Sequence, residues 1–383
     1  MQELRGTGKE EYESVIGLIN RIFREDRGFA PTMHLEYPLL LCHENMDNMR
    51  IIREDGRPVS TVSYYTSDII MEGASWKAAS VGSVCTHPDY RGRNYATLLM
   101  DDVEARMKAD GVEIMLVSGD RELYKRRGCT SVGGFYRAEL QPVPVRDEVA
   151  LAELDPSDMD RAARLYNREP ARFQRSYDQF VRLQRSVAAH RNCFDCRSCL
   201  VMRRGKAVAY IVAKIAVGAN TALIREFAGD RRAVLNGTYK LMEQQGLGQC
   251  TLVFPQQDLI GLLLEGDGVA LKPQDQQGTV KIMDFVSLMN GLRPYMKQYL
   301  PDKTVDGLNF LEQDGKYSIA LEDETVVIDN RDLLGRLIFG RKGQDSLVDS
   351  FCQKELADKL KIKSVLHTVF PVPFPWTENL NYV

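Results

Sequence analysis

The stretch SVGSVCTHPDYRGRNYATLL, residues 80–99, places a strand directly before an arginine- and glycine-bearing loop that begins a helix. Free backbone N–H groups and the positive end of a helix dipole favour a phosphate at such a junction, and Arg91 and Arg93 can add charge. The stretch contains neither GxxxxGK[ST] nor GxGxxG, which argues against a nucleoside triphosphatase and against a Rossmann dinucleotide site. The stretch therefore predicts an anion site that suits a pyrophosphate. The alternative is that the two arginines are merely solvated and bind no ligand.

The segments around this stretch follow the order of an α/β unit. They are a strand at 2–5, a helix with apolar residues at helical spacing, a hairpin at 49–65, a strand at 77–86, a helix through 107 and a strand at 112–117. Strand, helix, several strands, helix and strand in this order indicate a mixed sheet covered by helices. The fold class that we predict is therefore α/β with mixed sheets.

The same order returns after about residue 148, which is typical of an internal duplication. LVMRRGKAVAYIVA at 200–213 parallels RIIREDGRPVSTVSYY at 50–65, and AVLNGTYKLMEQQG at 233–246 parallels TLLMDDVEARMKADG at 97–111. The prolines of QPVPVRD, residues 141–147, disfavour regular structure and indicate a linker. Two related α/β domains are the expected result.

The pattern changes again after residue 281. A helix at 282–292 is followed by alternating segments around 317–321 and 325–328, which fit a third, smaller α+β domain. The chain closes with FPVPFPWTENLNYV, whose prolines favour an extended tail that could reach a distant site. We therefore expect domains at 1–144, 145–281 and 282–383.

Composition excludes several classes of protein. Of 383 residues, 44% are hydrophobic and 27% charged, and the net charge of −3 offers no basic surplus for binding nucleic acid. The apolar runs are far shorter than the 18 or so residues that a membrane span needs, and the first residues do not resemble a secretion signal. We expect a cytoplasmic protein that binds neither nucleic acid nor membrane, with eight cysteines that are mostly reduced thiols.

One cluster of soft ligands leaves two interpretations open. His190, Cys193, Cys196 and Cys199 have the spacing H-x-x-C-x-x-C-x-x-C. Structural zinc sites usually pair their ligands across a longer loop than this run offers, so reduced thiols at a domain surface are favoured over a metal site. No metal is expected.

Residues 84–96, VCTHPDYRGRNYA, resemble the motif V-x-V-x-x-P-x-x-R-x-x-G-x-A of the GNAT superfamily of N-acetyltransferases, and the match covers the whole first domain. The resemblance implies that acetyl-CoA is the co-substrate. Asn94 stands where the family usually has glycine, and Asn tolerates left-handed backbone angles better than most residues. The residues that the resemblance assigns to the cofactor are Val84, Cys85 and Thr86 for the pantetheine, Arg91, Gly92, Arg93, Asn94, Tyr95, Ala96 and Thr97 for the pyrophosphate, and Gly119 and Asp120 nearby.

The segment ELYKRRGC, residues 122–129, looks like the part of the family in which a tyrosine lies four residues before a glycine. The resemblance implies that Tyr124 is the general acid that protonates the departing CoA thiolate, which requires a phenol within hydrogen-bond reach of the sulfur. An ordinary amphipathic tyrosine on a short helix is the alternative.

The three-part architecture resembles the Eis-like aminoglycoside acetyltransferases. It implies tandem GNAT folds, of which the second is degenerate, followed by a domain like sterol carrier proteins. FAGDRRAVLNG replaces PDYRGRNYATL in the second copy, which is expected to be scaffold and to bind no CoA. In that family the C-terminal carboxylate, here that of Val383, is the general base; a frayed terminus is the alternative.

The resemblance implies acetyl transfer to a primary amine of an aminoglycoside-like molecule, a small polyamine or a lysine by direct attack. It also implies a homo-oligomer, with a hexamer as one form. Two other functions remain open at this point: a CoA-binding sensor or scaffold without catalysis, and a carrier of apolar ligands through the C-terminal domain.

Overall fold

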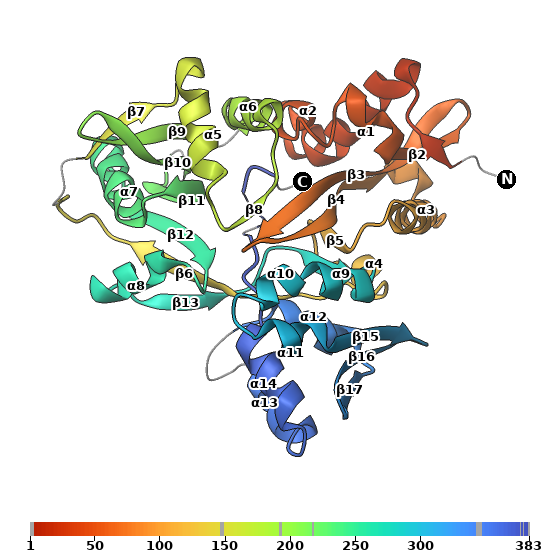
Figure 1. Ribbon diagram of the computed structural model, residues 1–383. Coiled ribbons are helices and arrows are strands. Elements are labelled where there is room, and N and C mark those ends of the chain that lie inside the picture. Colours follow the sequence, from red (N-terminus) through yellow and green to blue (C-terminus); the bar gives the residue numbers. More distant parts are fainter. Residues whose placement is uncertain are drawn as a thin grey trace.

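A computed structural model describes residues 4–145, 149–190, 194–216, 218–341, 347–375, 377 and 379–381. Figure 1 shows two mixed α/β units side by side, a smaller α+β unit below them, and a C-terminal tail that returns to the space between the first two units. The predicted α/β class with tandem mixed sheets is confirmed.

The first sheet has the strand order β1-β2-β3-β4-β5-β14, and β8 pairs with β3. Among the described strands of this sheet, only β4 and β5 pair in parallel. Neighbouring residues of β2 point to opposite faces, so that Ile51 packs in the core under α1 and Ile52 in the core under α3. The strands are β1 (Arg5–Gly6), β2 (Met49–Glu54), β3 (Arg57–Met71), β4 (Ala74–Thr86), β5 (Ile114–Val117), β8 (Ala171–Phe173) and β14 (Thr279–Ile282), and the helices are α1 (Tyr12–Phe23), α2 (Met33–Glu36), α3 (Tyr95–Ala109) and α4 (Glu122–Lys125).

The second sheet repeats this plan with the order β13-β6-β12-β11-β10-β9-β7. Its parallel pair, β11 and β12, is joined by α7, as α3 joins β4 and β5. The strands are β6 (Phe135–Leu140), β7 (Val149–Glu153), β9 (Phe194–Arg203), β10 (Lys206–Ala216), β11 (Thr221–Gly229), β12 (Gln249–Pro255) and β13 (Leu271–Gln274), and the helices are α5 (Met159–Tyr166), α6 (Tyr177–Ser186), α7 (Arg231–Gln245) and α8 (Leu259–Gly266).

The two sheets exchange strands across the expected boundaries near residues 144 and 281. β6 comes from the first expected unit but pairs with β12 and β13 in the second sheet. In return, β8 and β14 come from the second expected unit and pair with β3 and β5 in the first sheet. The segment 1–144 therefore does not complete the first sheet, because β14 occupies the free edge of β5.

The C-terminal part contains a three-stranded antiparallel sheet with helices. Its core is continuous with the lower end of the first sheet, where the edge of the Trp76 ring meets Phe339 with ring centroids 6.0 Å apart. The strands are β15 (Leu308–Gln313), β16 (Lys316–Leu321) and β17 (Glu324–Ile328), and the helices are α9 (Phe285–Gly291), α10 (Arg293–Met296), α11 (Asp302–Asp306), α12 (Arg331–Phe339), α13 (Leu347–Glu355) and α14 (Leu360–Val369). Among the described residues, no helix has the length and apolarity needed to cross a lipid bilayer.

Replacing Gly278 by alanine is expected to destabilise the protein by about 2 kcal/mol or more. Gly278 leads into β14 with φ +90°, and a Cβ there would lie 2.2 Å from the carbonyl oxygen of Val117 in β5. Urea denaturation measures the loss. The matched control is Gly17→Ala in α1, where a Cβ would meet nothing within 4 Å and a neutral or slightly stabilising effect is expected. Equal stability of the two variants would contradict the close approach of β14 to β5.

Candidate active site

The parallel strands β4 and β5 part before β4 ends. Their pairing runs from Ala78 opposite Ile114 to Val81 opposite Val117, whereas β4 continues to Thr86. A bulge lies on this free length, because the register with β3 shifts and Ser83 has a left-handed φ of 53°. The predicted residues Val84, Cys85 and Thr86 therefore lie on a length of β4 that β5 does not pair, although the carbonyls of Cys85 and Thr86 accept from the side chains of Ser60 and Arg91.

The loop after β4 turns sharply into α3. Gly92 and Asn94 both have left-handed backbone angles, with φ of 77° and 66°. The turn that the family motif makes with glycine is therefore made here with Asn94. Asn94 is also the N-cap of α3, and its side chain makes no capping hydrogen bond. The first-turn N–H groups of α3 are thus left for an anion.

The strand edge and the loop line one open cleft of about 750 Å³. Gly119 and Asp120 do not line it, although they follow β5 directly. The predicted residues that do line it are Val84, Cys85, Thr86, Arg91, Gly92, Arg93, Asn94, Tyr95, Ala96 and Thr97.

The cleft has a positive wall that sequence reasoning found only in part. Arg27 and Arg121 line it together with Arg91 and Arg93, and Asp26 is the one carboxylate among the lining residues. In the described part of the chain, no ion pair involves Arg27, Arg91 or Arg121. Arginines without a protein counter-charge favour an anionic ligand. Arg27 was missed because nothing in the sequence relates the end of α1 to a loop more than sixty positions later.

Tyr124 lies on α4 and, at 3% exposed, does not itself line this cleft, although Arg121 and Leu123 on either side of Glu122 do. Its ring is buried against Gly119, where an added Cβ would lie 3.2 Å from the ring carbon Cε2. Burial raises the pKa of Tyr124 above its usual value of 10, and the Arg121 charge opposes the rise. The phenol therefore keeps its proton at neutral pH, as a general acid must.

Cys85 is close to the same cleft but is not a nucleophile at neutral pH. Burial raises the pKa of its thiol to about 12, although Arg121 and Arg91 act in the opposite direction. Because the thiolate is the reactive form of cysteine, a covalent acyl-cysteine is disfavoured.

The C-terminal tail approaches the point where β4 and β5 part. Asn381 lines a small space there together with Ser80, Val117 and Ser118. Val383 lies outside the described residues, so its carboxylate remains a prediction.

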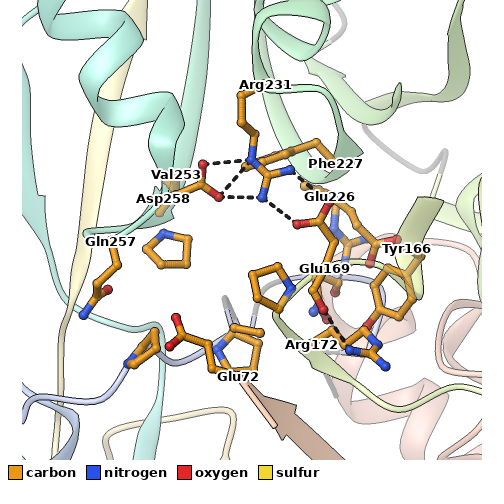
Figure 2. Close-up of a pocket in the computed structure, with 17 residues that line it drawn as sticks. Glu72, Tyr166, Glu169, Arg172, Glu226, Phe227, Arg231, Val253, Gln257 and Asp258 are labelled. Atoms are coloured by element: carbon orange, nitrogen blue, oxygen red, sulfur yellow. Dashed lines mark hydrogen bonds and ion pairs between the residues drawn. The ribbon is translucent and has the colours of Figure 1, made fainter. Parts of the chain in front are cut away.

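A second pocket lies between the second sheet, the turn between β3 and β4, and the tail (Figure 2). It has a volume of about 110 Å³. On its wall Arg231 is held between Glu169 at 2.5 Å and Asp258 at 2.8 Å. These ion pairs satisfy the guanidinium within the protein.

The start of α7 differs from the start of α3 in the way that the duplication predicts. Asp230 caps α7, and its carboxylate accepts a hydrogen bond of 2.7 Å from the N–H of Ala233. The chain's own carboxylate therefore occupies the position at which an anion would bind a helix start.

The candidate metal ligands do not converge. Cys196 and Cys199 are three residues apart in β9 and belong to separate cores on opposite faces of the second sheet. They cannot share one ion. Cys193 and the side chain of His190 lie outside the described residues, and within those described no group of three His, Cys, Asp or Glu side chains could hold a metal.

Comparison with known proteins agrees with the motif. Residues 3–132 match the family model described as an acetyltransferase (GNAT) domain. No curated protein matches the sequence.

Solved structures resemble the whole chain at low sequence identity. A GCN5-related N-acetyltransferase from Anabaena variabilis is 13% identical with a TM-score of 0.64, and the match covers 100% of both chains. A probable N-acyltransferase from Enterococcus faecalis is 13% identical with a TM-score of 0.66 over 98% of both chains. Eis1 from Mycobacterium abscessus is 15% identical with a TM-score of 0.60, over 89% of this chain and 90% of that one. The chain therefore shares the fold of these proteins from end to end.

Substitutions of Asn94 test the turn before α3. Asn94→Gly should leave the affinity for CoA within about twofold, because glycine adopts the same left-handed angles without strain. Asn94→Val should weaken CoA binding about tenfold, because a β-branched residue in this conformation costs about 1–2 kcal/mol. Calorimetric titration with CoA measures both. Equal affinities of the two variants would show that the turn does not shape the anion site.

Proposed function

We propose that the chain, whose residues 3–132 form a GNAT acetyltransferase domain, moves an acetyl group from acetyl-CoA to a primary amine. The acceptor class that we propose is an aminoglycoside-like molecule, a small polyamine or a lysine side chain. The observation that supports the proposal best is the continuity of the unpaired edge of β4 with the positively charged loop before α3. In acetyl-CoA the thioester lies on an extended arm, and the arm ends in phosphates. The arm would lie along the edge of β4, and the phosphates would lie at the loop.

The residues present fit the co-substrate. The backbone at Val84, Cys85 and Thr86 would pair with the amides of the pantetheine as a strand would. The pyrophosphate would lie against Gly92 to Thr97, where the first-turn N–H groups of α3 and the Arg91 side chain favour negative charge. Arg27 and Arg121 add two cations to the same cleft.

The proposed reaction is direct transfer. The neutral amine attacks the thioester carbonyl, the C–S bond breaks, and the proton of the Tyr124 phenol goes to the departing sulfur. The C-terminal carboxylate of Val383 takes the proton that the attacking nitrogen releases. Holding both reactants in one cleft supplies much of the rate, because the step becomes effectively unimolecular.

The proposed terminal carboxylate would attract the ammonium group of a cationic acceptor. We also propose a cytoplasmic location and a homo-oligomer, with a hexamer as one form. If the protein binds CoA but transfers no acetyl group, the result would favour a CoA-binding sensor without catalysis.

Replacing Tyr124 by phenylalanine should lower kcat about a hundredfold or more and leave the affinity for CoA unchanged, because only the proton donor is lost. Thiol release from acetyl-CoA with a panel of aminoglycosides, polyamines and lysine peptides measures the rate. Because burial raises the pKa of Tyr124, the acid is present below that pKa and lost above it, so the alkaline loss of kcat should fall above pH 10 in the unsubstituted enzyme. A phenylalanine variant with full turnover would remove Tyr124 from the mechanism.

Removing Val383 should lower kcat about tenfold or more, because the terminal carboxylate is then displaced by one residue. The same thiol-release assay measures it. Val383→Ala keeps the carboxylate in place and so separates the loss of the side chain from the loss of the carboxylate's position. If the shortened chain turns over at the full rate, the terminal carboxylate is not the base.

A further inference from the structure

A buried ion pair lies in the second copy, far along the sequence from the acetyltransferase motif. Arg175 and Glu226 are 3% and 5% exposed. Glu226 projects from β11, and Arg175 lies between β8 and α6. The Arg175 guanidinium also stacks on the ring of Tyr166, with its carbon 3.9 Å from the ring centroid. Figure 2 shows Glu226 and Tyr166 on the side of the second pocket that adjoins the tail.

Every polar group of this pair has a partner, and the tail supplies two of them. The pair itself is bidentate, with N–O distances of 3.0 Å and 2.6 Å, and the Tyr210 hydroxyl donates to Glu226 at 2.8 Å. From the tail, the N–H of Leu380 donates to Glu226 Oε2 at 3.2 Å. Arg175 Nε donates to the side-chain oxygen of Asn381 at 2.6 Å.

The pair and the tail depend on each other. Removing two charges from water is costly, and a buried pair repays this cost only when its remaining hydrogen-bonding sites are filled. If the tail left, Arg175 Nε would lose its partner, Glu226 Oε2 would keep only its bond to Arg175, and Leu380, now 4% exposed, would enter water. Although burial opposes ionisation, the Arg175 charge and these hydrogen bonds lower the pKa of Glu226, so the pair stays ionised at neutral pH.

The anchored residue is also the one that reaches the strand fork. Asn381 binds Arg175 and at the same time lines the small space beside Ser80, Val117 and Ser118. The contact with Arg175 therefore holds this part of the tail beside the fork.

We propose that the second copy serves as the anchor of the C-terminal tail, and that Arg175 and Glu226 are positioning residues for the catalytic terminal carboxylate. The inference rests on the proposed function. The second copy would then have a structural role, although the position for an anion at the start of its helix α7 is occupied by Asp230. Arg175 and Glu226 act through Leu380 and Asn381 and do not touch the reactants.

The test uses the full-length enzyme and two measurements. One is hydrogen–deuterium exchange of the peptide that contains Leu380, and the other is steady-state kinetics by thiol release. Glu226→Gln removes the charge and one acceptor, and Asn381→Ala removes only the tail's partner for Arg175. Each should speed exchange at the tail and lower kcat about tenfold to a hundredfold, with the KM for acetyl-CoA within about twofold.

Two further variants separate positioning from general damage. Asp258→Asn makes the same carboxylate-to-amide change in the ion pairs of Arg231, which do not involve the tail, and should alter neither exchange nor kcat. Asn381→Asp keeps the oxygen that accepts from Arg175 and should restore most of the rate lost in Asn381→Ala. Because Asn381 lies on the tail, its variants stay informative even if Glu226→Gln fails to fold.

Removal of residues 380–383 distinguishes a failure of the tail anchor from a failure of the proposed base role of the carboxylate. If it lowers kcat to a rate that is still measurable and Glu226→Gln in the shortened chain causes no further loss, the positioning role is supported. Unchanged exchange in both Glu226→Gln and Asn381→Ala would overturn the anchor. If exchange rises in these variants but removal of 380–383 leaves kcat unchanged, the anchor stands, while the base role of the carboxylate and with it the positioning role are overturned.

Discussion

Two parallel strands that stop pairing while one of them continues leave a row of backbone N–H and C=O groups for something else to satisfy. In this protein β4 outruns β5 beyond the Val81–Val117 pair, and the rest of the site is arranged around that opening. The loop with two left-handed residues begins where β4 ends, Tyr124 lies on the short helix after β5, and the tail arrives at the fork itself. The strand edge, the loop, the helix that carries Tyr124 and the tail thus come together around the fork, where the proposed acyl arm, proton donor and amine would meet.

Local sequence patterns predicted much of the fold and most of the residues of the cleft that we propose for acetyl-CoA. Alternation and helical spacing predicted the elements around residues 80–99, and the residues that the motif assigns, Val84 to Thr86 and Arg91 to Thr97, all line one cleft. The exchange of β6, β8 and β14 between the sheets could not be predicted, because strand order depends on pairing between segments far apart in the chain. For the same reason Arg27 and the Arg175–Glu226 pair left no signal that spacing could reveal.

The comparison of the two copies shows how little change closes an anion site. Both copies present a helix N-terminus after a strand, and the positive end of the dipole is the same in each. In α3 the N-cap is Asn94, which makes no capping bond, whereas in α7 the Asp230 carboxylate occupies that position and Arg231 is neutralised by Glu169 and Asp258. The start of α7 is therefore capped and neutralised by the chain's own carboxylates, whereas the start of α3 has no side-chain cap.

The exchanged strands also determine the order in which the protein can be completed during synthesis. When β5 leaves the ribosome, the strand that will cover its free edge lies far downstream and has not yet been made. An uncovered edge invites pairing with other chains, so the nascent chain passes through a period in which it is prone to aggregate. Neither sheet could be produced alone from one contiguous segment without leaving such an edge behind.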